Sequence, residues 1–446
     1  MVKIDDSWRC APALQQPVYP DPQELQKVVA DLETRPPLVF AGEVDRLKQQ
    51  IALAAKGESF ILMGGDCAET FADSNADQIR LKIQTILQMA IVLTYGGAIP
   101  IVKMGRMAGQ YAKPRSRAVE VRDGVTLPVY RGDAVNSHEF TASARTPDPR
   151  RLLEMYTHSA STINLIRAFT QGGYADIREV HRWNKGFTKN PAYARFEKLA
   201  GGVDHALRFM RAAGVDFETL RTVDFYSAHE ALLLEYEHAL TRVDSRTSNV
   251  YNTSAHMLWI GERTRDPQGA HVQMLAHVAN PIGIKIGPGA ASSDIGRLLD
   301  ELNPQGEPGR ITLITRFGAD QVADKLPPLI EFVRADGREV TWLADPMHGN
   351  TITTATGLKT RVFGTILREV EEFFRVHRLM GSVPGGIHVE LTGDDVTEVM
   401  GGGEPISEDD LTDRYETLVD PRLNHQQSLE LAFLVAELLN PTLDVD

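Results

Sequence analysis

The sequence predicts an α/β protein built on one eight-stranded (β/α)8 TIM barrel. Short runs rich in Ile, Val and Leu recur eight times from residue 60 onward, and helical patterns separate several of them, as parallel β/α architecture requires. Each run ends in polar or charged residues, and barrel enzymes build their sites from the C-terminal ends of strands. The length of 446 residues is greater than that of a usual domain, but a single barrel with insertions accommodates it.

The strands are expected in order at 60–67, 99–105, 223–230, 257–264, 281–288, 311–318, 340–348 and 385–392. Two helices carry clear signals. Ser74-Asn75-Ala76-Asp77 resembles a capping box, and an apolar stripe follows it at helical spacing, made of Ile79, Ile83, Ile86 and Ala90. The last helix presents one face made of Leu429, Phe433, Ala436 and Leu439, and Pro441 follows where this helix should stop.

An insertion at 106–222, between the second and third strands, exceeds a minimal barrel. It begins with an expected hairpin around Asp123-Gly124, a dipeptide suited to the positive φ angles of a tight turn, flanked by Val119, Val121, Val125 and Leu127. Helical segments near 150–170 and 192–213 follow it.

The N-terminal extension 1–58 is the second addition to the barrel. Because the strand ends already supply a full site, we assign the extension and the insertion to oligomer contacts or regulation rather than to chemistry. The whole chain, 1–446, is expected to form a single catalytic domain.

Charge and composition narrow the classes of function. The net charge of -13 would repel nucleic acid and anionic membranes, so an anionic ligand must be held by a local cluster of Lys and Arg. The charged N-terminus does not resemble a signal peptide, and we expect a cytoplasmic protein. Ile83 to Val102 carries no charge over twenty residues, but Gln84, Gln88, Gly96, Gly97 and Pro100 interrupt it, which indicates a helix, a turn and a buried strand rather than a membrane span.

The two cysteines, Cys10 and Cys67, are not expected to form a disulfide in a reducing compartment. Cys67 lies between Asp66 and Glu69, whose negative charges would raise the pKa of a thiol unless a cation intervenes. A lone buried cysteine is usually a small apolar side chain, so a metal ligand and a core residue are both open for this position.

The other strand ends strengthen the case for a metal ion. Imidazole and carboxylate groups occur in Asp345-Pro346-Met347-His348-Gly349-Asn350, in His388-Val389-Glu390 and in Asp420-Pro421. Together with a thiolate they suit manganese, cobalt, zinc or iron. Strand alternation places His388 and Glu390 on one face. The residues alone favour His388 no less than His348 as a ligand, and a structural role for His388 is equally open.

Basic residues form a second set near the strand ends, which consists of Lys103, Arg106, Lys113, Arg115, Arg263, Lys285 and Arg316. Single Lys and Arg residues are mostly solvated surface groups. Lys103, Lys285 and Arg316, however, fall inside otherwise apolar strands, where an unpaired charge would cost several kcal/mol. Small phosphorylated substrates are the natural partners of such a set.

A dinucleotide site is a weaker interpretation. Lys285-Ile286-Gly287-Pro288-Gly289 lacks the third glycine of the dinucleotide fingerprint, and Pro288 falls in the turn. The sequence also contains no P-loop, catalytic-triad signature, kinase set or paired-cysteine zinc motif.

Six motifs, in order across nearly the whole chain, resemble those of the type II 3-deoxy-D-arabino-heptulosonate 7-phosphate (DAHP) synthases. They are Gly64-Gly65-Asp66-Cys67-Ala68-Glu69-Thr70-Phe71, Gly105-Arg106-Met107-Ala108-Gly109-Gln110-Tyr111-Ala112-Lys113-Pro114-Arg115-Ser116, Trp259-Ile260-Gly261-Glu262-Arg263-Thr264-Arg265, Lys285-Ile286-Gly287-Pro288, Asp345-Pro346-Met347-His348-Gly349-Asn350 and Gly385-Gly386-Ile387-His388-Val389-Glu390.

The resemblance implies a transferase that condenses phosphoenolpyruvate with D-erythrose 4-phosphate and releases phosphate, as the first step of the shikimate pathway to chorismate and the aromatic amino acids. It implies one divalent metal ion, Mn²⁺ or Co²⁺ ahead of Zn²⁺ or Fe²⁺, with the ligands Cys67, His348, Glu390 and Asp420. The implied phosphoenolpyruvate site consists of Arg106, Glu262, Arg263, Lys285 and Arg316. The segment Lys113, Arg115 and Ser116 matches the part of the family that holds the phosphate of erythrose 4-phosphate.

In the implied mechanism the metal acts as a Lewis acid on the aldehyde oxygen and promotes attack by C3 of phosphoenolpyruvate. Water then adds at C2, phosphate leaves, and Lys285 or a metal-bound water gives a proton to the new hydroxyl. We expect Lys285, Cys67 and Glu262 to be the catalytic residues. The resemblance also implies an aromatic amino acid as an allosteric effector and a homodimer or homotetramer.

Two other functions are compatible with the same residues. A different metal-dependent phosphosugar aldolase would need the same metal and phosphate contacts, and a requirement for phosphoenolpyruvate with release of phosphate separates it from a DAHP synthase. A non-catalytic member that binds an effector is the other alternative, and the loss of a metal ligand would favour it. No ligand position is lost.

Overall fold

In a computed structural model of the chain, residues 4–175 and 222–440 are described, with residues 202, 205, 206, 208–210 and 212–214 between them. The central feature is a closed barrel of eight strands, whose order is β1-β14-β11-β10-β9-β8-β5-β2. Every neighbouring pair is parallel. The strands are β1 (Phe60–Gly65), β2 (Ile101–Arg106), β5 (Tyr226–Glu230), β8 (Met257–Ile260), β9 (Ile282–Ile286), β10 (Ile311–Thr315), β11 (Thr341–Ala344) and β14 (Gly386–Glu390). Each lies within or at the edge of one expected run, which confirms the predicted TIM barrel.

Strand alternation divides the apolar side chains between the inside and the outside of the barrel. Ile61 and Met63 pack inside with Trp259 and Leu343, while Phe60 and Leu62 pack outside against the helices. On β2, Val102 and Met104 belong to the inner set, so Lys103 between them faces outward and donates to the Ile101 carbonyl. The expectation that Lys103 joins the basic cluster of the site is therefore wrong, because its strand position points it away from the barrel interior.

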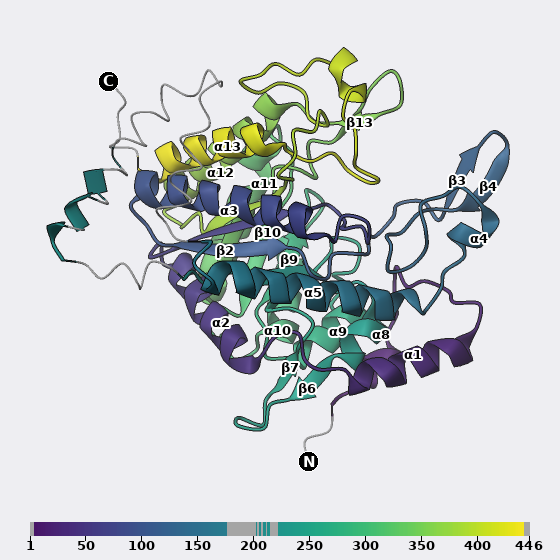
Figure 1. Cartoon of the computed structure of the whole chain (residues 1–446). Coiled ribbons are helices and arrows are strands. Elements are labelled where there is room, and N and C mark those ends of the chain that lie inside the picture. Colours follow the sequence, from purple (N-terminus) through teal and green to yellow (C-terminus); the bar gives the residue numbers. More distant parts are fainter. Residues whose placement is uncertain are drawn as a thin grey trace.

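The described helices lie mostly on the outside of the barrel (Figure 1). They are α1 (Pro22–Thr34), α2 (Ala41–Ala55), α3 (Ala76–Gly97), α4 (Ala142–Arg145), α5 (Arg151–Gln171), α8 (Leu234–Ala239), α9 (Ala270–Ala276), α10 (Ser292–Leu302), α11 (Val322–Asp336), α12 (Phe363–Met380) and α13 (His425–Leu439), with 3-10 turns η1 (Ser7–Cys10) and η3 (Asp409–Thr412). Short two-stranded sheets pair β6 (Thr241–Val243) with β7 (Val250–Asn252), and β12 (Ile352–Thr353) with β13 (Lys359–Thr360).

Helix α3 occupies most of the uncharged stretch that could have been mistaken for a membrane span. Its N-cap is Asn75, whose side chain accepts a hydrogen bond from the Gln78 amide, so the expected capping sequence is shifted by one residue from Ser74. Ile79, Ile83, Ile86 and Ala90 are buried as predicted, and α3 lies beside the C-terminal helix α13 (Figure 1). Among the described residues, no helix is long and apolar enough to cross a membrane.

Helix α2 of the N-terminal extension closes the end of the barrel where the strands begin. Leu47, Ile51 and Ala54 are fully buried and belong to the same apolar cluster as the inward-facing residues Ile61 and Met63. Part of the extension therefore packs as barrel core, a role that we did not expect from the sequence. The site must lie at the opposite, C-terminal end of the strands.

The insertion after β2 begins with the expected hairpin, formed by β3 (Val119–Arg122) and the antiparallel β4 (Val125–Pro128). Asp123 and Gly124 have φ angles of 50° and 78°, as a tight hairpin turn requires. The hairpin projects from the barrel (Figure 1), and helix α5 follows it where a helix was expected. The helix expected near 192–213 falls for the most part outside the described residues.

Substitution of Gly386 by alanine is expected to destabilise the barrel. A Cβ atom there would lie 2.4 Å from the Ile61 carbonyl oxygen, because β1 and β14 pair closely at this position. Overpacking of this kind costs about 1–3 kcal/mol. A lower denaturant midpoint would be measured by circular dichroism. Gly364→Ala on α12 is the matched control, since nothing lies within 4 Å of its added Cβ, and an equal loss of stability there would contradict the explanation.

Candidate active site

A cavity of about 1020 Å³ opens at the C-terminal ends of the barrel strands. It contains every residue to which a metal or substrate role was assigned except Glu390, and Glu390 lies directly beside it in contact with His348. The assigned residues that line it are Cys67, Arg106, Lys113, Arg115, Ser116, Glu262, Arg263, Lys285, Arg316, His348 and Asp420. The fold therefore brings together residues that are up to 353 positions apart in the chain.

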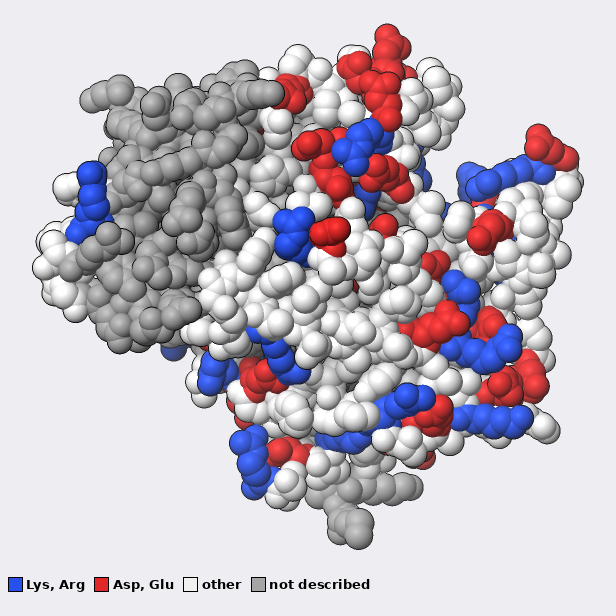
Figure 2. All heavy atoms as spheres, in the orientation of Figure 1, with Lys and Arg blue, Asp and Glu red and all other residues white. Residues whose placement is uncertain are grey.

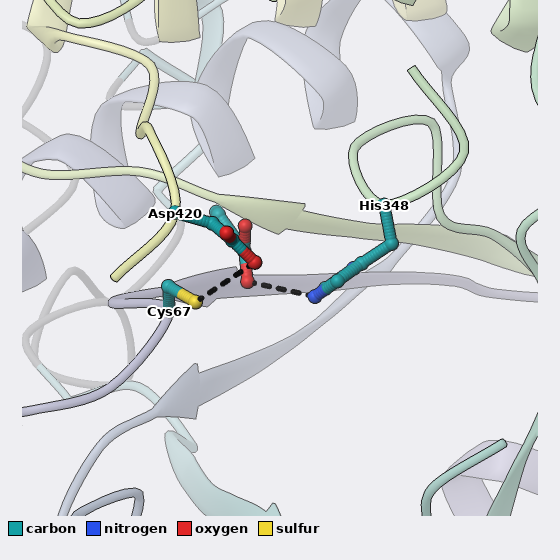
Figure 3. A group of neighbouring side chains, drawn as sticks. Cys67, His348 and Asp420 are labelled. Carbon is teal, nitrogen blue, oxygen red and sulfur yellow. Dashed lines mark hydrogen bonds and ion pairs between the residues drawn. The ribbon is translucent and has the colours of Figure 1, made fainter. Parts of the chain in front are cut away.

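The four expected metal ligands form one cluster (Figure 3). Cys67 follows β1, His348 lies in the loop after β11, Glu390 ends β14, and Asp420 lies in the long loop before α13. One donor atom from each residue lies within 4.8 Å of the others. His348 Nε2 is 3.0 Å from Glu390 Oε1, and Cys67 Sγ is 3.9 Å from Asp420 Oδ2.

Asp345 orients the imidazole of His348. Its carboxylate Oδ2 lies 2.7 Å from Nδ1, and its Oδ1 accepts the backbone amides of Met347 and His348. A histidine held through one ring nitrogen by a carboxylate presents the other nitrogen to a metal. Nε2 of His348 accordingly faces the cluster.

The chemistry of the donors fits a divalent cation. Burial and, after it, the nearby charge of Glu390 raise the pKa of the Cys67 thiol to about 12, so Cys67 needs a cation to become a thiolate ligand. Burial opposes ionisation of Asp420, but the positive charges of Lys113, Arg361 and Lys359 together outweigh it and hold the pKa of Asp420 below its usual value. The Lys113 ammonium contacts both Cys67 Sγ and Asp420 Oδ2, which shows that the cluster attracts positive charge.

His388 does not belong to this cluster. It is fully buried beside Trp259, and its Nε2 atom contacts the guanidinium of Arg106. Because a guanidinium only donates, that nitrogen must accept and cannot serve a metal. Burial, followed by the charges of Lys285 and Arg106, holds the pKa of His388 well below its usual value. The interpretation of His388 as a ligand equal to His348 is therefore wrong, and the structural alternative is correct.

Arg106 and Lys285 form a basic floor in the cavity. Arg106 donates to the carbonyls of Asp66 and Cys67 at 3.0 and 3.2 Å, and its guanidinium lies 5.1 Å from the centre of the Trp259 ring. The Lys285 ammonium contacts Asp345 and lies 5.9 Å from the same ring. Burial lowers the pKa of Lys285 to about 8, because little solvent compensates its charge. Lys285 is therefore suited to exchange a proton near neutral pH.

Glu262 and Arg316 are held in place at the rim of this floor. Glu262 accepts the Gly287 amide at 2.6 Å and Arg265 Nη2 at 3.0 Å. Arg316 Nη2 donates to the His348 carbonyl at 3.2 Å, while its Nε is buried without a hydrogen-bond partner among the described residues. Such a donor favours an anionic ligand in the cavity.

The segment from Lys113 to Ser116 lies along one wall, and two parts of the chain fix it. Glu69 accepts the backbone amides of Ala108, Gly109 and Gln110 at 2.8 to 3.0 Å, which holds the loop that leads into the segment. Gln15 of the N-terminal extension exchanges two hydrogen bonds with the backbone of Arg115. The extension therefore contacts this segment directly.

Two polar residues at strand ends, Asp66 and His229, have structural roles. The Asp66 carboxylate contacts Lys82 and receives Arg422 Nη1 at 2.8 Å. His229 pairs with the buried Glu237 at 2.7 Å, outside the cavity. Both residues point away from the cluster, although they adjoin residues that face it.

No strand end or motif in the sequence singled out two residues at the site. Lys359 lines the cavity, and its Nζ atom lies 2.7 Å from Asp420 Oδ1. Arg361 is buried against Glu390. Lys359 and Arg361 belong to a loop that contains the small β12–β13 hairpin, so a search restricted to the barrel strands could not find them. The Thr356-Gly357 dipeptide, in the turn of this hairpin, was the sequence feature that could have indicated the loop.

On the face that Figure 2 shows, basic side chains of the described residues mostly lie beside acidic ones. Pairs such as Arg150 with Asp148 and Arg35 with Asp31 are close enough to neutralise each other. The cavity differs, because several of its cations face a shared space rather than a single carboxylate.

Comparison with known proteins agrees with this geometry. The model of the class-II DAHP synthetase family matches residues 3–436. The phospho-2-dehydro-3-deoxyheptonate aldolase of Streptomyces coelicolor is 58% identical over 434 residues, which cover 97% of this chain and 96% of that protein. The enzyme of the same name from Mycolicibacterium smegmatis is 50% identical over 440 residues, covering 97% of this chain and 94% of that protein.

Proposed function

This chain belongs to the class-II DAHP synthetase family and is a 3-deoxy-7-phosphoheptulonate synthase of the shikimate pathway, and we propose that the cavity at the C-terminal end of the barrel is its active site. The reaction joins phosphoenolpyruvate to D-erythrose 4-phosphate and releases phosphate. One observation carries the proposal: the cluster of Cys67, His348, Glu390 and Asp420 opens into the same cavity as the basic residues.

We assign these four residues to one divalent metal ion. The family is metal-dependent, and the mixed sulfur, nitrogen and oxygen donors suit Mn²⁺ or Co²⁺, with Zn²⁺ and Fe²⁺ as alternatives. When bound, such an ion supplies Lewis acidity toward the aldehyde oxygen of erythrose 4-phosphate.

Phosphoenolpyruvate is assigned to the basic floor. Its carboxylate and phosphate require separate cations, which Arg106, Arg263, Lys285 and Arg316 supply within the same cavity. The Trp259 ring lies close to the charged groups of Arg106 and Lys285 and limits the access of water to them. Glu262, fixed by the Gly287 amide, is positioned to orient the water that adds at C2.

Lys285 is assigned the proton transfer. With a pKa of about 8 it is mostly protonated at neutral pH and can give its proton from Nζ to the oxygen of the former aldehyde. Asp345 contacts both Lys285 and His348, so it holds the proton donor and a metal ligand in one fixed arrangement.

The phosphate of erythrose 4-phosphate is assigned to Lys113, Arg115 and Ser116. The contacts of Lys113 with Cys67 and Asp420 support this placement, because they bring the segment next to the metal cluster where the aldehyde must react. Gln15 anchors the backbone of Arg115, and Arg115 lines the cavity.

Substitution of Arg115 by methionine is expected to raise the KM for erythrose 4-phosphate about 10-fold to 100-fold, since a charge-assisted hydrogen bond is worth about 1.5–3 kcal/mol. The KM for phosphoenolpyruvate should change little. Steady-state kinetics with each substrate varied in turn measures both values. A larger effect on phosphoenolpyruvate than on erythrose 4-phosphate would contradict the assignment.

The N-terminal extension and the insertion at 106–222 are assigned to assembly as a homodimer or homotetramer and to regulation by an aromatic amino acid. The projecting β3–β4 hairpin supports a role in assembly, because Val119, Val121 and Val125 are 49%, 63% and 52% exposed. Size-exclusion chromatography with light scattering tests the assembly. Rate measurements with single aromatic amino acids test the regulation.

The product distinguishes the proposed reaction from its alternatives. Mass spectrometry of the reaction mixture is expected to detect DAHP with equimolar phosphate. A phosphosugar aldolase would form a product without consuming phosphoenolpyruvate. A non-catalytic member would form none, although it would still bind a ligand in the cavity.

A further inference from the structure

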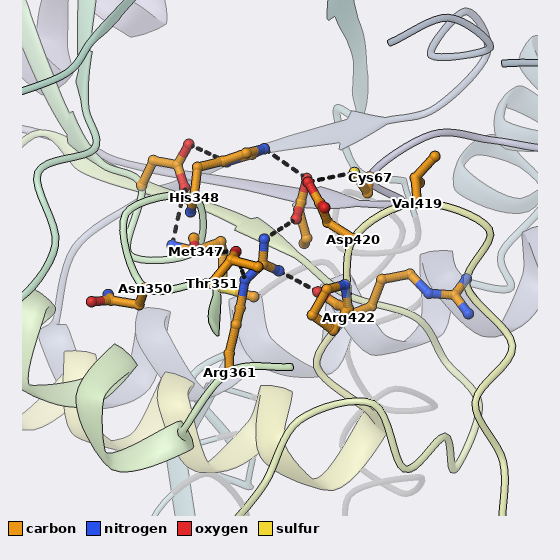
Figure 4. A network of polar contacts seen from close by, with 12 residues as sticks. Cys67, Met347, His348, Asn350, Thr351, Arg361, Val419, Asp420 and Arg422 are labelled. Atoms are coloured by element: carbon orange, nitrogen blue, oxygen red, sulfur yellow. Dashed lines mark hydrogen bonds and ion pairs between the residues drawn. The ribbon is translucent and has the colours of Figure 1, made fainter. Parts of the chain in front are cut away.

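Arg361 lies beneath the metal cluster, at the centre of the network in Figure 4. The residue is fully buried, in the loop between β13 and α12. Its guanidinium makes three separate contacts. Nε donates to Thr351 Oγ1 at 3.0 Å, Nη1 donates to the Pro421 carbonyl, and Nη2 forms an ion pair with Glu390 Oε2 at 2.8 Å.

These three contacts reach three of the four segments that carry the proposed ligands. Thr351 is three residues after His348, Pro421 directly follows Asp420, and Glu390 is itself a ligand. We infer that Arg361 is a positioning residue, which fixes these three segments relative to one another and commits Glu390 to a single donor oxygen. The inference rests on the proposed metal role of the cluster.

The two carboxylate oxygens of Glu390 have different surroundings. Oε1 faces the cluster, 3.0 Å from His348 Nε2, and lies 3.3 Å from Arg106 Nη2. Oε2 faces Arg361 on the other side. A carboxylate can bind a metal through one oxygen or through both. The ion pair places a positive charge 2.8 Å from Oε2 and repels a second cation there, so Glu390 is left to bind through Oε1 alone. The four residues then contribute four donor atoms.

Arginine is required for this arrangement because its planar fork holds donors in fixed, diverging directions. The backbone of Arg361 is anchored as well, since its carbonyl accepts the Met400 amide at 2.9 Å. The Thr360 hydroxyl next to it donates to the Glu398 carbonyl at 2.9 Å. A lysine would keep the positive charge, but its single nitrogen on a flexible stem could not keep all three contacts in these directions.

The test compares Arg361→Lys and Arg361→Met with the wild-type protein. Loss of groups that orient metal ligands typically weakens metal binding about 10-fold to 100-fold. We expect this loss in both variants, measured as the dissociation constant for Co²⁺ in competition with a chromophoric chelator. In the Co²⁺-loaded variants the visible d–d bands should also weaken, because a second oxygen of Glu390 raises the coordination number.

A matched control excludes a general loss of folding. Arg310 is likewise buried and donates to three backbone carbonyls, those of Leu302, Asn280 and Leu275. It lies just before β10, at the opposite end of the barrel from the cavity. Arg310→Lys should lower the thermal stability of the metal-free protein without changing the Co²⁺ dissociation constant.

Thr351→Val removes one hydrogen-bond acceptor of Arg361 and keeps the test informative if the Arg361 variants do not fold. This variant should weaken Co²⁺ binding several-fold.

The outcomes separate the inference from the proposed function. If the wild-type protein binds no Co²⁺ at the cluster, the metal assignment fails. If it binds Co²⁺ and Arg361→Lys binds it equally well with an unchanged spectrum, only the role of Arg361 is overturned. Tighter binding in Arg361→Met would also overturn it, because the guanidinium would then act only as a competing cation.

Discussion

Replacement of His348 by alanine is expected to remove the metal ion from the enzyme and to lower kcat by at least about 10³-fold. The variant loses one of the four donor atoms that would hold the metal, and the aldehyde substrate then lacks a Lewis acid. A loss of about 10³-fold in rate corresponds to a loss of about 4 kcal/mol of transition-state stabilisation. Metal content after dialysis and the rate at saturating substrates are the two measurements.

His388→Gln is the matched comparison for this variant, because the sequence alone favoured both histidines. His388 contacts Arg106 rather than the cluster, so its replacement should leave the metal content at one ion per chain. Retention of metal in His348→Ala together with its loss in His388→Gln would show that the assigned ligand set is wrong.

Replacement of Lys285 by methionine is expected to lower kcat/KM about 10²-fold to 10⁴-fold, the range for the loss of a general acid. Metal content should remain unchanged, since Lys285 is not among the cluster residues. Steady-state kinetics and metal analysis on the same preparation measure both effects. A loss of metal in this variant would assign its defect to the cluster instead of to proton transfer.

The pH profile tests the role of Lys285 independently. Its pKa is lowered by burial to about 8, and the protonated form is the proton donor. The active form is therefore present below this pKa, and kcat/KM of the wild-type enzyme should fall as the pH rises above about 8. Lys285→Arg keeps a positive charge that does not titrate in this range, so its residual kcat/KM should lack that fall. An unchanged alkaline fall in Lys285→Arg would assign the titration to another group.

The barrel could be predicted from the sequence because each parallel strand is buried on both faces and reads as a continuous apolar run. The hairpin could be predicted because Asp123-Gly124 encodes a turn locally. The role of α2 could not, since the stripe of Leu47, Ile51 and Ala54 shows that a helix is amphipathic without showing which surface it covers. That surface is formed by strands far along the chain.

The site was partly predictable for the same reason. Strand ends identified Arg106, Lys285 and Glu390, whose direction follows from the period of a strand. Lys103 was misplaced because a charged residue in an apolar strand can face outward and bond its own backbone.

The choice between His348 and His388 depended on their contacts with Asp345 and Arg106, which no local pattern encodes. The resemblance to the DAHP synthases supplied this choice before the structure did. The role of Arg361 could not be predicted, because its three partners come from three separate segments of the chain.

Consumption of phosphoenolpyruvate by the purified protein is the most direct test of the proposed active site. It is followed with erythrose 4-phosphate present or absent, before and after chelation, and again with Mn²⁺ or Co²⁺ restored. We expect consumption only when the aldehyde and the metal are both present. Consumption that persists in the chelated protein, or that does not require erythrose 4-phosphate, would contradict the assignment of the cluster and cavity to this reaction.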